Sequence, residues 1–443
     1  MMRMPLATAG LLALAVSLAG CGDDTEKAVV APGATPAASS APVAPKADDQ
    51  SAQQAVVAHY ADLALAVFGD AASTGKALQA AIEALLADPS DATLQAARAA
   101  WLAARVPYMQ SEVFRFGNPV VDEWEGQLNA WPLDEGLIDY VAKGYPHALG
   151  NPGATANIIA NTQLQVGEDK LDVSTLTPEL LASLNELGGS EANVATGYHA
   201  IEFMLWGQDL HGNGPGAGER PASDFKVGDG ATGGHNERRR AFLKAASDLL
   251  VSDLDAMVVQ WQPGQAGNYR ASLLAEAPAN GLRKMLFGMG SLSLGELAGE
   301  RMKVALEANS SEDEHDCFSD NTHNSHFYNA KGIRNVYLGE YRKVDGTTLS
   351  GPSLSSLVAK ANAEADTTLK GDLQNSEAKL QALVDSADKG VHFDQLIAAD
   401  NSKGQQLVRD AIAALVKQTA AIEQAASTLA IGDLNPDTAD HQF

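Results

Sequence analysis

Two residues in one short apolar segment have the types and spacing of metal ligands. His199 and Glu202 lie three positions apart in segment 197–207, so a helix would place both side chains on one face. Imidazole and carboxylate groups together bind zinc, iron or copper. Because the flanking residues are apolar, we expect the pair to be buried and to need polar partners. The alternative is a purely structural His–Glu pair; the zinc-protease pattern His-Glu-x-x-His does not occur in the sequence.

A second segment, 312–326, combines three histidines, five carboxylates and one cysteine within fifteen residues. Its His315, Asp316 and Asp320 are candidate metal ligands, and its many oxygens suit a hard cation. The spacing does not match an EF-hand loop, and the alternative is a solvated polar loop between domains. Cys317 is not interpreted as a nucleophile, because nearby carboxylates raise the pKa of a thiol and keep it protonated.

Two carboxylates just upstream could reach the same site. Glu296 and Glu300 are four positions apart, so on a helix they would share a face. They could turn toward His199, or they could form ordinary salt bridges with Arg301 or Lys303.

Aromatic and charged residues are interleaved in segments 105–119 and 129–140. This mixture favours an ordered, partly buried polar network, because buried charges need partners. The alternative is a helix end packed on a loop.

The composition excludes several classes of function. The 443-residue chain has 56 acidic residues against 31 Lys and Arg, a formal net charge of -25. Nucleic acid is therefore not an expected partner, whereas cations are. The sequence contains no phosphate-binding Walker loop, dinucleotide fingerprint or nucleophile elbow.

The elements that must position these residues are helices. From Ser51 onward the chain is rich in good helix formers with apolar residues at helical spacing, and no convincing run of strands is present. Long amphipathic helices are predicted at 354–387 and 405–429. A stretch from 207 to 236 contains nine glycines and two prolines, which is typical of a domain junction. We therefore predict an all-α protein with two four-helix-bundle-like domains, residues 51–220 and 221–443.

The N-terminus has the features of a targeting signal. Residues 1–20 have the positive start, short apolar stretch and small-residue end of a secretory signal, followed by Cys21. The site resembles a bacterial lipobox, so Cys21 is the predicted lipidated N-terminus; the alternative is ordinary cleavage beside an incidental cysteine. Residues 21–50 are rich in Ala and Pro and predict a flexible linker. We expect an outer-membrane lipoprotein that faces the periplasm.

These segments together resemble the imelysin family of bacterial envelope proteins, and the resemblance covers nearly all of the chain from Ser51 onward. It is carried by four ordered blocks: Gly197-x-His199-x-x-Glu202, Trp101 to Phe116 with Arg105-x-x-Tyr108 and Glu112, Asn129-Ala130-Trp131-Pro132, and Glu314 to Asn321. The last block is similar to the iron-regulated protein A branch. The resemblance implies two helical bundles with the His-x-x-Glu region near their junction.

The resemblance also implies a ligand set, and three hypotheses about function remain open. A metal ion, iron or zinc, would bind at His199 and Glu202, and then at Glu112, Glu296 and the carboxylates of the Glu314 to Asp320 block. The first hypothesis is a metal-binding lipoprotein of iron uptake, which could act with an uptake receptor or another envelope protein. The second is a zinc metallopeptidase of the insulin-cleaving type, with Glu202 as a catalytic base or ligand. The third is a non-catalytic interaction scaffold.

Overall fold

The computed structural model describes residues 47–443, apart from the side chains of Ala47 and Asp169. Helices make up most of this part of the chain, which confirms the predicted all-α class. The predicted signal peptide and the lipidation site Cys21 lie outside the described residues, as does most of the linker. The first helix already begins at Ala47, inside the segment predicted as linker.

Long helices form the body of the protein. The longest are α1 (Ala47–Ala87), α2 (Asp91–Ser111), α6 (Asn236–Trp261), α10 (Thr322–Leu338), α12 (Ala363–Ala387) and α14 (Ser402–Thr428). The shorter α-helices are α3 (Pro119–Leu128), α4 (Pro178–Ala182), α5 (Gly197–Trp206), α7 (Tyr269–Ala275), α8 (Pro278–Ser291), α9 (Val304–Ala308), α11 (Leu354–Ala361) and α13 (Phe393–Ile397). Short 3-10 segments are η1 (Glu112–Phe114), η2 (Glu135–Leu137), η3 (Leu187–Gly189) and η4 (Ala222–Phe225).

Polar side chains define where several helices begin. Ser90 caps α2 through a capping box with Thr93, which satisfies backbone N–H groups that have no partner inside the helix. The single helix predicted at 354–387 is instead two helices. Asn362 ends α11 and its side chain accepts hydrogen bonds from the first turn of α12, so the chain turns there.

Strands are few in residues 47–443 and form two short hairpins. β1 (Gln163–Val166) pairs antiparallel with β2 (Asp169–Asp172), with Gln163 opposite Asp172. β3 (Glu340–Arg342) pairs antiparallel with β4 (Thr348–Ser350), with Tyr341 opposite Leu349. Both hairpins lie between helices, and they contribute Leu164, Val166 and Tyr341 to the apolar cores.

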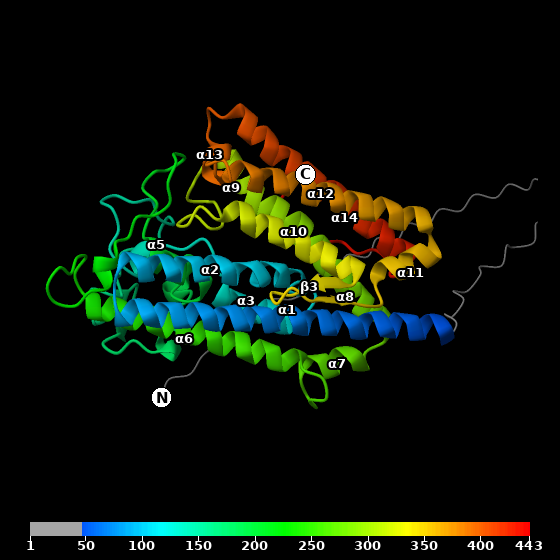
Figure 1. Cartoon of the computed structure of the whole chain (residues 1–443), viewed down its shortest axis with the longest axis horizontal. Helices are drawn as coiled ribbons and strands as arrows, with labels where there is room; N and C mark the ends of the chain where they lie inside the picture. The colour runs from blue at the N-terminus through cyan, green and yellow to red at the C-terminus, as the bar shows by residue number, and fades with distance from the viewer. Residues whose placement is uncertain (1–46) are drawn as a thin grey trace, which may run out of the picture. The chain divides into compact units, whose positions relative to one another are not determined.

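The helices pack around apolar cores that share α1. In Figure 1, α1 lies between α2 and α6, and α10 lies between α2 and the antiparallel pair α12 and α14. The first core joins the C-terminal half of α1 to α2, α5 and α6, and includes Ile82. The second joins the N-terminal half of α1 to α8, α10, α12 and α14, and includes Tyr60 and Phe68. A smaller third core is formed by apolar side chains of α9, α13, α14 and neighbouring helices, and includes Leu306, Phe393 and Leu415.

Helix α1 is long and apolar enough, by length and composition, to cross a membrane. Its apolar side chains, however, are taken up by the two cores: Tyr60, Phe68 and Ile82 are almost completely buried. The core helix of a globular protein has the same length and composition, so these two properties do not define a membrane span.

The domain boundary predicted at residues 220/221 stays a prediction. Residues 46–443 form one compact unit. Helix α6 follows the predicted boundary, yet it packs along α1 and α5, which precede it. The glycine-rich stretch between α5 and α6 therefore links helices that share a core.

One helix departs from the α form. Directly after α8 the chain continues as a π-helix, η5 (Leu292–Lys303), a rare form that is often found at functional sites. Glu296 pairs with Arg301, five residues later, as the wider turn of a π-helix allows. Glu300 contacts His441 near the C-terminus instead. Glu296 and Glu300 therefore have different partners, and neither bonds to His199.

Candidate metal centre

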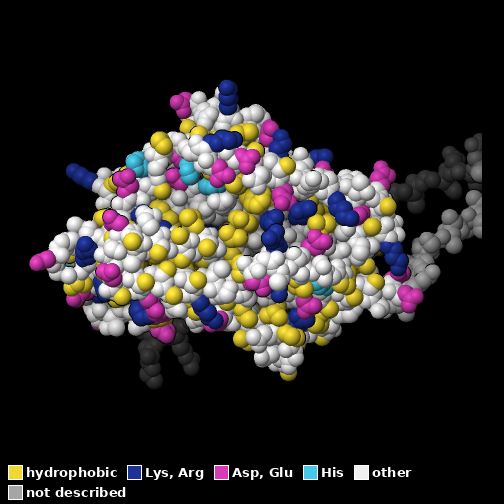
Figure 2. Space-filling view, in the orientation of Figure 1, with side chains coloured by type: hydrophobic (Ala, Val, Ile, Leu, Met, Phe, Trp, Pro, Cys, Tyr) yellow, Lys and Arg dark blue, Asp and Glu magenta, His cyan; other side chains and the backbone are white. Residues whose placement is uncertain are grey.

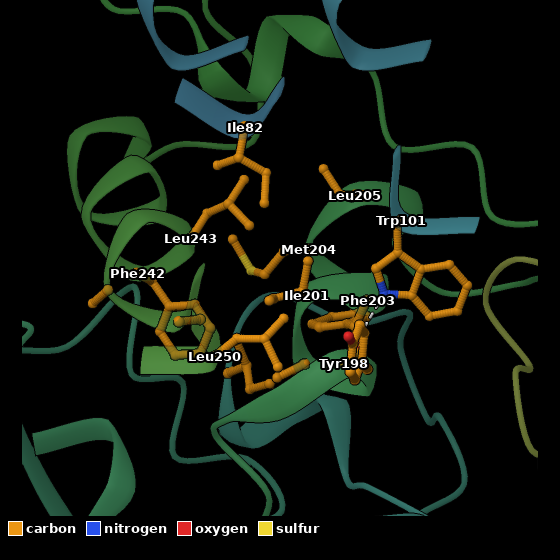
Figure 3. Packing of buried hydrophobic residues seen from close by; sticks show 14 of the residues in the cluster. Ile82, Trp101, Tyr198, Ile201, Phe203, Met204, Leu205, Phe242, Leu243 and Leu250 are labelled. Carbon is orange, nitrogen blue, oxygen red and sulfur yellow. Dashed lines mark hydrogen bonds between the residues drawn. The ribbon is translucent and has the colours of Figure 1, made fainter. Parts of the chain in front are cut away.

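Helix α5 carries both His199 and Glu202 and is buried along its whole length. One side of the helix packs on apolar side chains of α1 and α6, as Figure 3 shows for Ile82, Leu243 and Leu250. On another side, Trp101 of α2 donates a hydrogen bond of 2.9 Å from its indole to the Tyr198 carbonyl. Packing on both sides fixes the rotation of α5 about its axis. His199 and Glu202 therefore face the loop 309–321, which connects α9 to α10.

The backbone at the start of α5 requires a glycine. Gly197 has a φ of +80°, which favours glycine strongly. A Cβ at this position would overlap the backbone carbonyl of Leu128 at the end of α3. Glycine therefore lets α5 begin directly against α3 and sets the position of the two polar side chains that follow.

Glu202 holds His199 and is itself held by the loop. His199 Nδ1 lies 2.9 Å from Glu202 Oε2. The other carboxylate oxygen, Oε1, accepts hydrogen bonds from the backbone N–H of Ser319 at 3.0 Å and from its hydroxyl at 2.6 Å. When Glu202 is ionised, both of its oxygens accept and His199 donates from Nδ1. The lone pair on Nε2 is then available for a metal ion, an arrangement common among metal-binding histidines.

Three buried side chains bring candidate ligand atoms together. One ligand atom each from His199, His315 and Asp316 lies within 4.8 Å of the other two. The rings of the two histidines are 4.7 Å apart and nearly perpendicular. Nε2 of His199 is buried and has no hydrogen-bond partner among the described residues. A buried polar atom without a partner is costly, and a metal ion would satisfy it.

Asp316 is fixed by hydrogen bonds to both of its oxygens. Arg105 of α2 forms an ion pair with Oδ1 at 2.9 Å. Asn321 donates to Oδ2 at 2.8 Å, and the hydroxyl of Ser325 donates to the same oxygen. These contacts hold the carboxylate in one orientation beside the two histidines, as a preorganised ligand requires.

A network of buried charges connects the site to the π-helix. Arg105 donates to Asn129 at 2.6 Å, and Asn129 in turn donates to Glu112. Arg301 of η5 then pairs with both Glu112 and Glu296. The predicted polar network around segments 105–119 and 129–140 is therefore present, and it includes the π-helix.

The network carries more negative than positive charge. Its guanidinium groups are Arg105, Arg115 and Arg301, and its carboxyl groups are Glu112, Glu125, Glu202, Glu296 and Asp316. If all were ionised, the balance would be two negative charges. A divalent cation would neutralise them.

Burial sets the protonation of these groups. It lowers the pKa of His199 and of His315 well below the usual range, so both rings are neutral, as metal ligands must be. Burial, followed by the Asp316 charge, raises the pKa of Glu202 well above its usual range, so a nearby positive charge such as a bound metal ion favours its ionised form. Burial also acts to raise the pKa of Asp316, but the Arg105 charge and the bond to His315 outweigh it and keep the carboxylate ionised.

The residues predicted as one metal site lie in three places. His199, His315 and Asp316 come together, with Glu202 bonded behind His199. Glu112 and Glu296 lie against Arg301, in the salt-bridge role that was the alternative for Glu296. Asp320 belongs to a separate carboxylate cluster.

Sequence reasoning did not assign Ser319, Ser325 and Asn321 any role, although their side chains fix Glu202 and Asp316. Their positions inside the polar 312–326 segment were the available signal. Nothing in the sequence indicated that Arg301 pairs with Glu112, because 189 positions separate the two residues.

A pocket of about 280 Å³ adjoins the site between α2 and α10. Its lining includes Arg105, Asn321 and Ser325, the side chains that bond to Asp316.

The fold and the site define an all-α protein with a histidine and carboxylate cluster buried among its helices. The chain belongs to the imelysin family: the family model described as Imelysin, Peptidase M75, matches residues 64–422. No match was found among curated protein sequences.

Two solved structures share the fold. One is described as an iron-regulated protein A precursor from Parabacteroides distasonis; it is 20% identical, has a TM-score of 0.62, and the alignment covers 88% of this chain and 97% of that one. The other is an imelysin-like protein from Psychrobacter arcticum; it is 15% identical, has a TM-score of 0.56, and the alignment covers 86% and 96% of the two chains. At these identities the likeness establishes the fold.

Proposed function

We propose that this protein binds a transition metal ion, iron or zinc, through Nε2 of His199 together with His315 and Asp316. The observation that carries the proposal is the buried, unpartnered Nε2 of His199, which lies in a group of three candidate ligands within 4.8 Å. Two imidazoles and one carboxylate form a ligand set that suits iron or zinc, and a fourth position would remain for water or another ligand.

In this proposal Glu202 is a positioning residue. Its carboxylate bonds to His199 Nδ1 and to Ser319, and it is not among the three side chains whose ligand atoms lie within 4.8 Å of one another. A carboxylate behind a ligating imidazole fixes the ring and strengthens it as a ligand. This role replaces the expectation that Glu202 itself binds the metal or acts as a catalytic base.

We extend the proposal to a role in iron uptake at the cell envelope. It is supported by the lipobox-like end of the signal at Cys21, the acidic net charge of -25 and the fold shared with a protein described as iron-regulated. The protein would be held at the outer membrane by its lipid, face the periplasm, and pass its metal ion to an uptake receptor or another envelope protein.

A Cys21→Ser substitution tests the envelope part of the proposal. The variant should move from the membrane fraction to the periplasmic fraction after cell fractionation, because its anchor is lost. A wild-type protein found only in the periplasmic fraction would contradict lipid anchoring and would favour simple signal cleavage.

The metallopeptidase alternative rests on the description of the family model. The geometry offers it less support. His199, His315 and Asp316 are each at most 1% exposed, and a peptide substrate needs direct access to the metal and to a general base. Glu202, the candidate base, is bonded to His199 and Ser319.

Metal titration of the chelator-treated protein tests the proposal. Wild type should bind one equivalent of Fe²⁺ or Zn²⁺ at this site, as measured by calorimetry and by elemental analysis. His199→Ala should lose more than the roughly 10–100-fold in affinity that follows removal of an outer hydrogen-bond partner. His147→Ala, at an exposed histidine, is the matched control and should bind as wild type does.

Two outcomes would support the other hypotheses. Equal metal binding by wild type and His199→Ala, with a loss of stability in the variant, would indicate a purely structural His–Glu pair and a scaffold. Chelator-sensitive cleavage of an unfolded peptide by wild type, abolished in Glu202→Ala, would indicate a peptidase. Cleavage that survives in Glu202→Ala would point to a contaminant.

A further inference from the structure

A second cluster of carboxylates lies apart from His199. One oxygen each from Glu314, Asp320 and Asp394 lies within 4.8 Å of the other two. Glu314 and Asp320 come from the 309–321 loop, whereas Asp394 comes from α13, more than seventy positions later in the chain. All three are at most 4% exposed, so they cannot be a solvated acidic patch.

These carboxylates lack the partners that buried charges need. Both oxygens of Glu314, both of Asp394 and Oδ1 of Asp320 are buried without a well-formed hydrogen bond among the described residues. The Thr322 side chain and the Gln395 backbone N–H lie near enough only to lower the pKa values of Glu314 and Asp394 in part. No Lys or Arg in residues 47–443 forms an ion pair with any of the three. Burying several unpaired carboxylates is among the most unfavourable arrangements in a protein interior. The cluster therefore points to a positively charged group that completes it.

Among the surrounding side chains of residues 47–443, only the imidazoles of His211 and His392 act through their charge to lower the pKa of a member of the cluster, Asp320. The side chains that act electrostatically on the cluster are Asp209, His211 and His392. The imidazole of His392 bonds to the backbone carbonyl of Asp320 at 3.1 Å. Burial, with mutual repulsion second, raises the pKa of Asp394 to about 7, and burial with repulsion from Asp209 raises that of Asp320 to about 6. The negative charge on one carboxylate thus raises the pKa of its neighbours and favours their protonated forms when no cation is present.

We propose that Glu314, Asp320 and Asp394 bind a hard divalent cation of the calcium class at a second site. Every donor in the cluster is an oxygen, and three carboxylates suit Ca²⁺, which takes six to eight oxygen ligands in flexible geometry. Water and backbone carbonyls would complete its shell. Zinc and ferrous iron are better matched to the imidazole-containing group around His199.

The cation adds a link between parts of the chain that already contact each other through Asn309 with Ile397 and His392 with Asp320. It ties the 309–321 loop to α13, at the end of the protein where Figure 2 shows histidine and acidic side chains gathered on the surface. Glu314 directly precedes His315, so the same ion holds the loop that carries His315 and Asp316. The second site thus stabilises the loop that carries ligands of the first site. The existence of the second site does not depend on the proposed function.

Calorimetric titration of the chelator-treated full chain with Ca²⁺ alone tests the proposal. Wild type should bind one equivalent and gain thermal stability in proportion to the logarithm of Ca²⁺ concentration. Asp394→Asn should lower Ca²⁺ affinity by about tenfold or more, because ligand charge sets affinity. Asp400→Asn, at an exposed aspartate shortly after α13, is the matched control and should leave affinity unchanged.

The same variant gives a second readout that does not need calcium. Asp394→Asn removes one repelling charge, so the metal-free variant should melt at a higher temperature than metal-free wild type. If this variant does not fold, as judged by circular dichroism, Glu314→Gln takes its place. Absence of Ca²⁺ binding by wild type, or wild-type affinity in a folded Asp394→Asn variant, would overturn the proposal.

The two metal proposals can fail separately. Asp394→Asn should still bind Zn²⁺ at the His199 group, and His199→Ala should still bind Ca²⁺. Loss of Ca²⁺ binding in His199→Ala would contradict a separate second site.

Discussion

His199 has one ring nitrogen engaged and the other free, and this asymmetry decides its chemistry. Glu202 accepts from Nδ1 and thereby selects the form of the ring whose Nε2 can bind a metal ion. Ser319 holds Glu202 in place through two hydrogen bonds. Glu202 thus acts through His199, so substitutions at the two positions should weaken metal binding to different degrees.

We predict that Glu202→Gln lowers the affinity for Zn²⁺ by roughly 10–100-fold without abolishing binding. The amide keeps the shape of the side chain, but it no longer offers a negative charge to orient and strengthen the imidazole. Calorimetric titration of wild type and variant measures the change. Glu191→Gln, at an exposed glutamate, serves as the control. Complete loss of binding in Glu202→Gln would instead make Glu202 a direct ligand.

At the scale of elements, the site depends on how closely three of them approach. Helix α5 begins against the end of α3 at Gly197. The 309–321 loop brings His315 and Asp316 to α5, and α2 contributes Arg105, which pairs with Asp316. The π-helix η5 places Arg301 between Glu112 and Glu296, so these carboxylates are neutralised by the protein itself.

Gly197→Ala should destabilise the protein by at least about 2 kcal/mol, because a side chain at positive φ is strained and its Cβ overlaps the Leu128 carbonyl. Urea unfolding gives the free energy. Gly126→Ala in α3 is the matched control: a Cβ there meets nothing within 4 Å, so alanine should raise helix stability by up to about 1 kcal/mol. Equal effects of the two substitutions would contradict the close approach of α5 to α3.

At the scale of the whole molecule, a large acidic excess is organised in two ways. Some carboxylates are paired with buried arginines, as Glu112 and Glu296 are with Arg301. Others are buried without a cation and hold protons at pH values where free carboxyl groups would be ionised. Folding stability should therefore depend on pH and on added metal ions.

Glu125 shows this dependence. Burial is the main cause that raises its pKa from 4.5 to about 7. A carboxyl group whose pKa is higher in the folded than in the unfolded state contributes stability that is complete below pH 4.5 and is lost as the pH rises toward 7. For metal-free wild type this loss is on the order of 3 kcal/mol.

Glu125→Gln should remove this part of the pH dependence. Urea unfolding in chelator at a series of pH values measures it. Glu123→Gln, at an exposed position of the same helix, should keep the wild-type curve. Parallel curves for wild type and Glu125→Gln would show that folding does not raise the pKa of Glu125.

The sequence by itself determined the helical class, the burial of α5 and the candidate ligands His199, His315 and Asp316. Helical spacing of apolar residues and clusters of polar ones are local patterns, so they can be read along the chain. The imelysin resemblance also came from local blocks, and the family match confirms it.

Only the tertiary structure decided which carboxylates share a site. The pairing of Glu112 with Arg301, and of Asp394 with Glu314 and Asp320, joins residues far apart in sequence. The π-helical turn changed which residues lie beside Glu296. The physical reason is that the pairing of a buried charge depends on three-dimensional proximity, which local spacing does not encode. One predicted metal site therefore became a histidine site, a neutralised salt-bridge network and a separate carboxylate cluster.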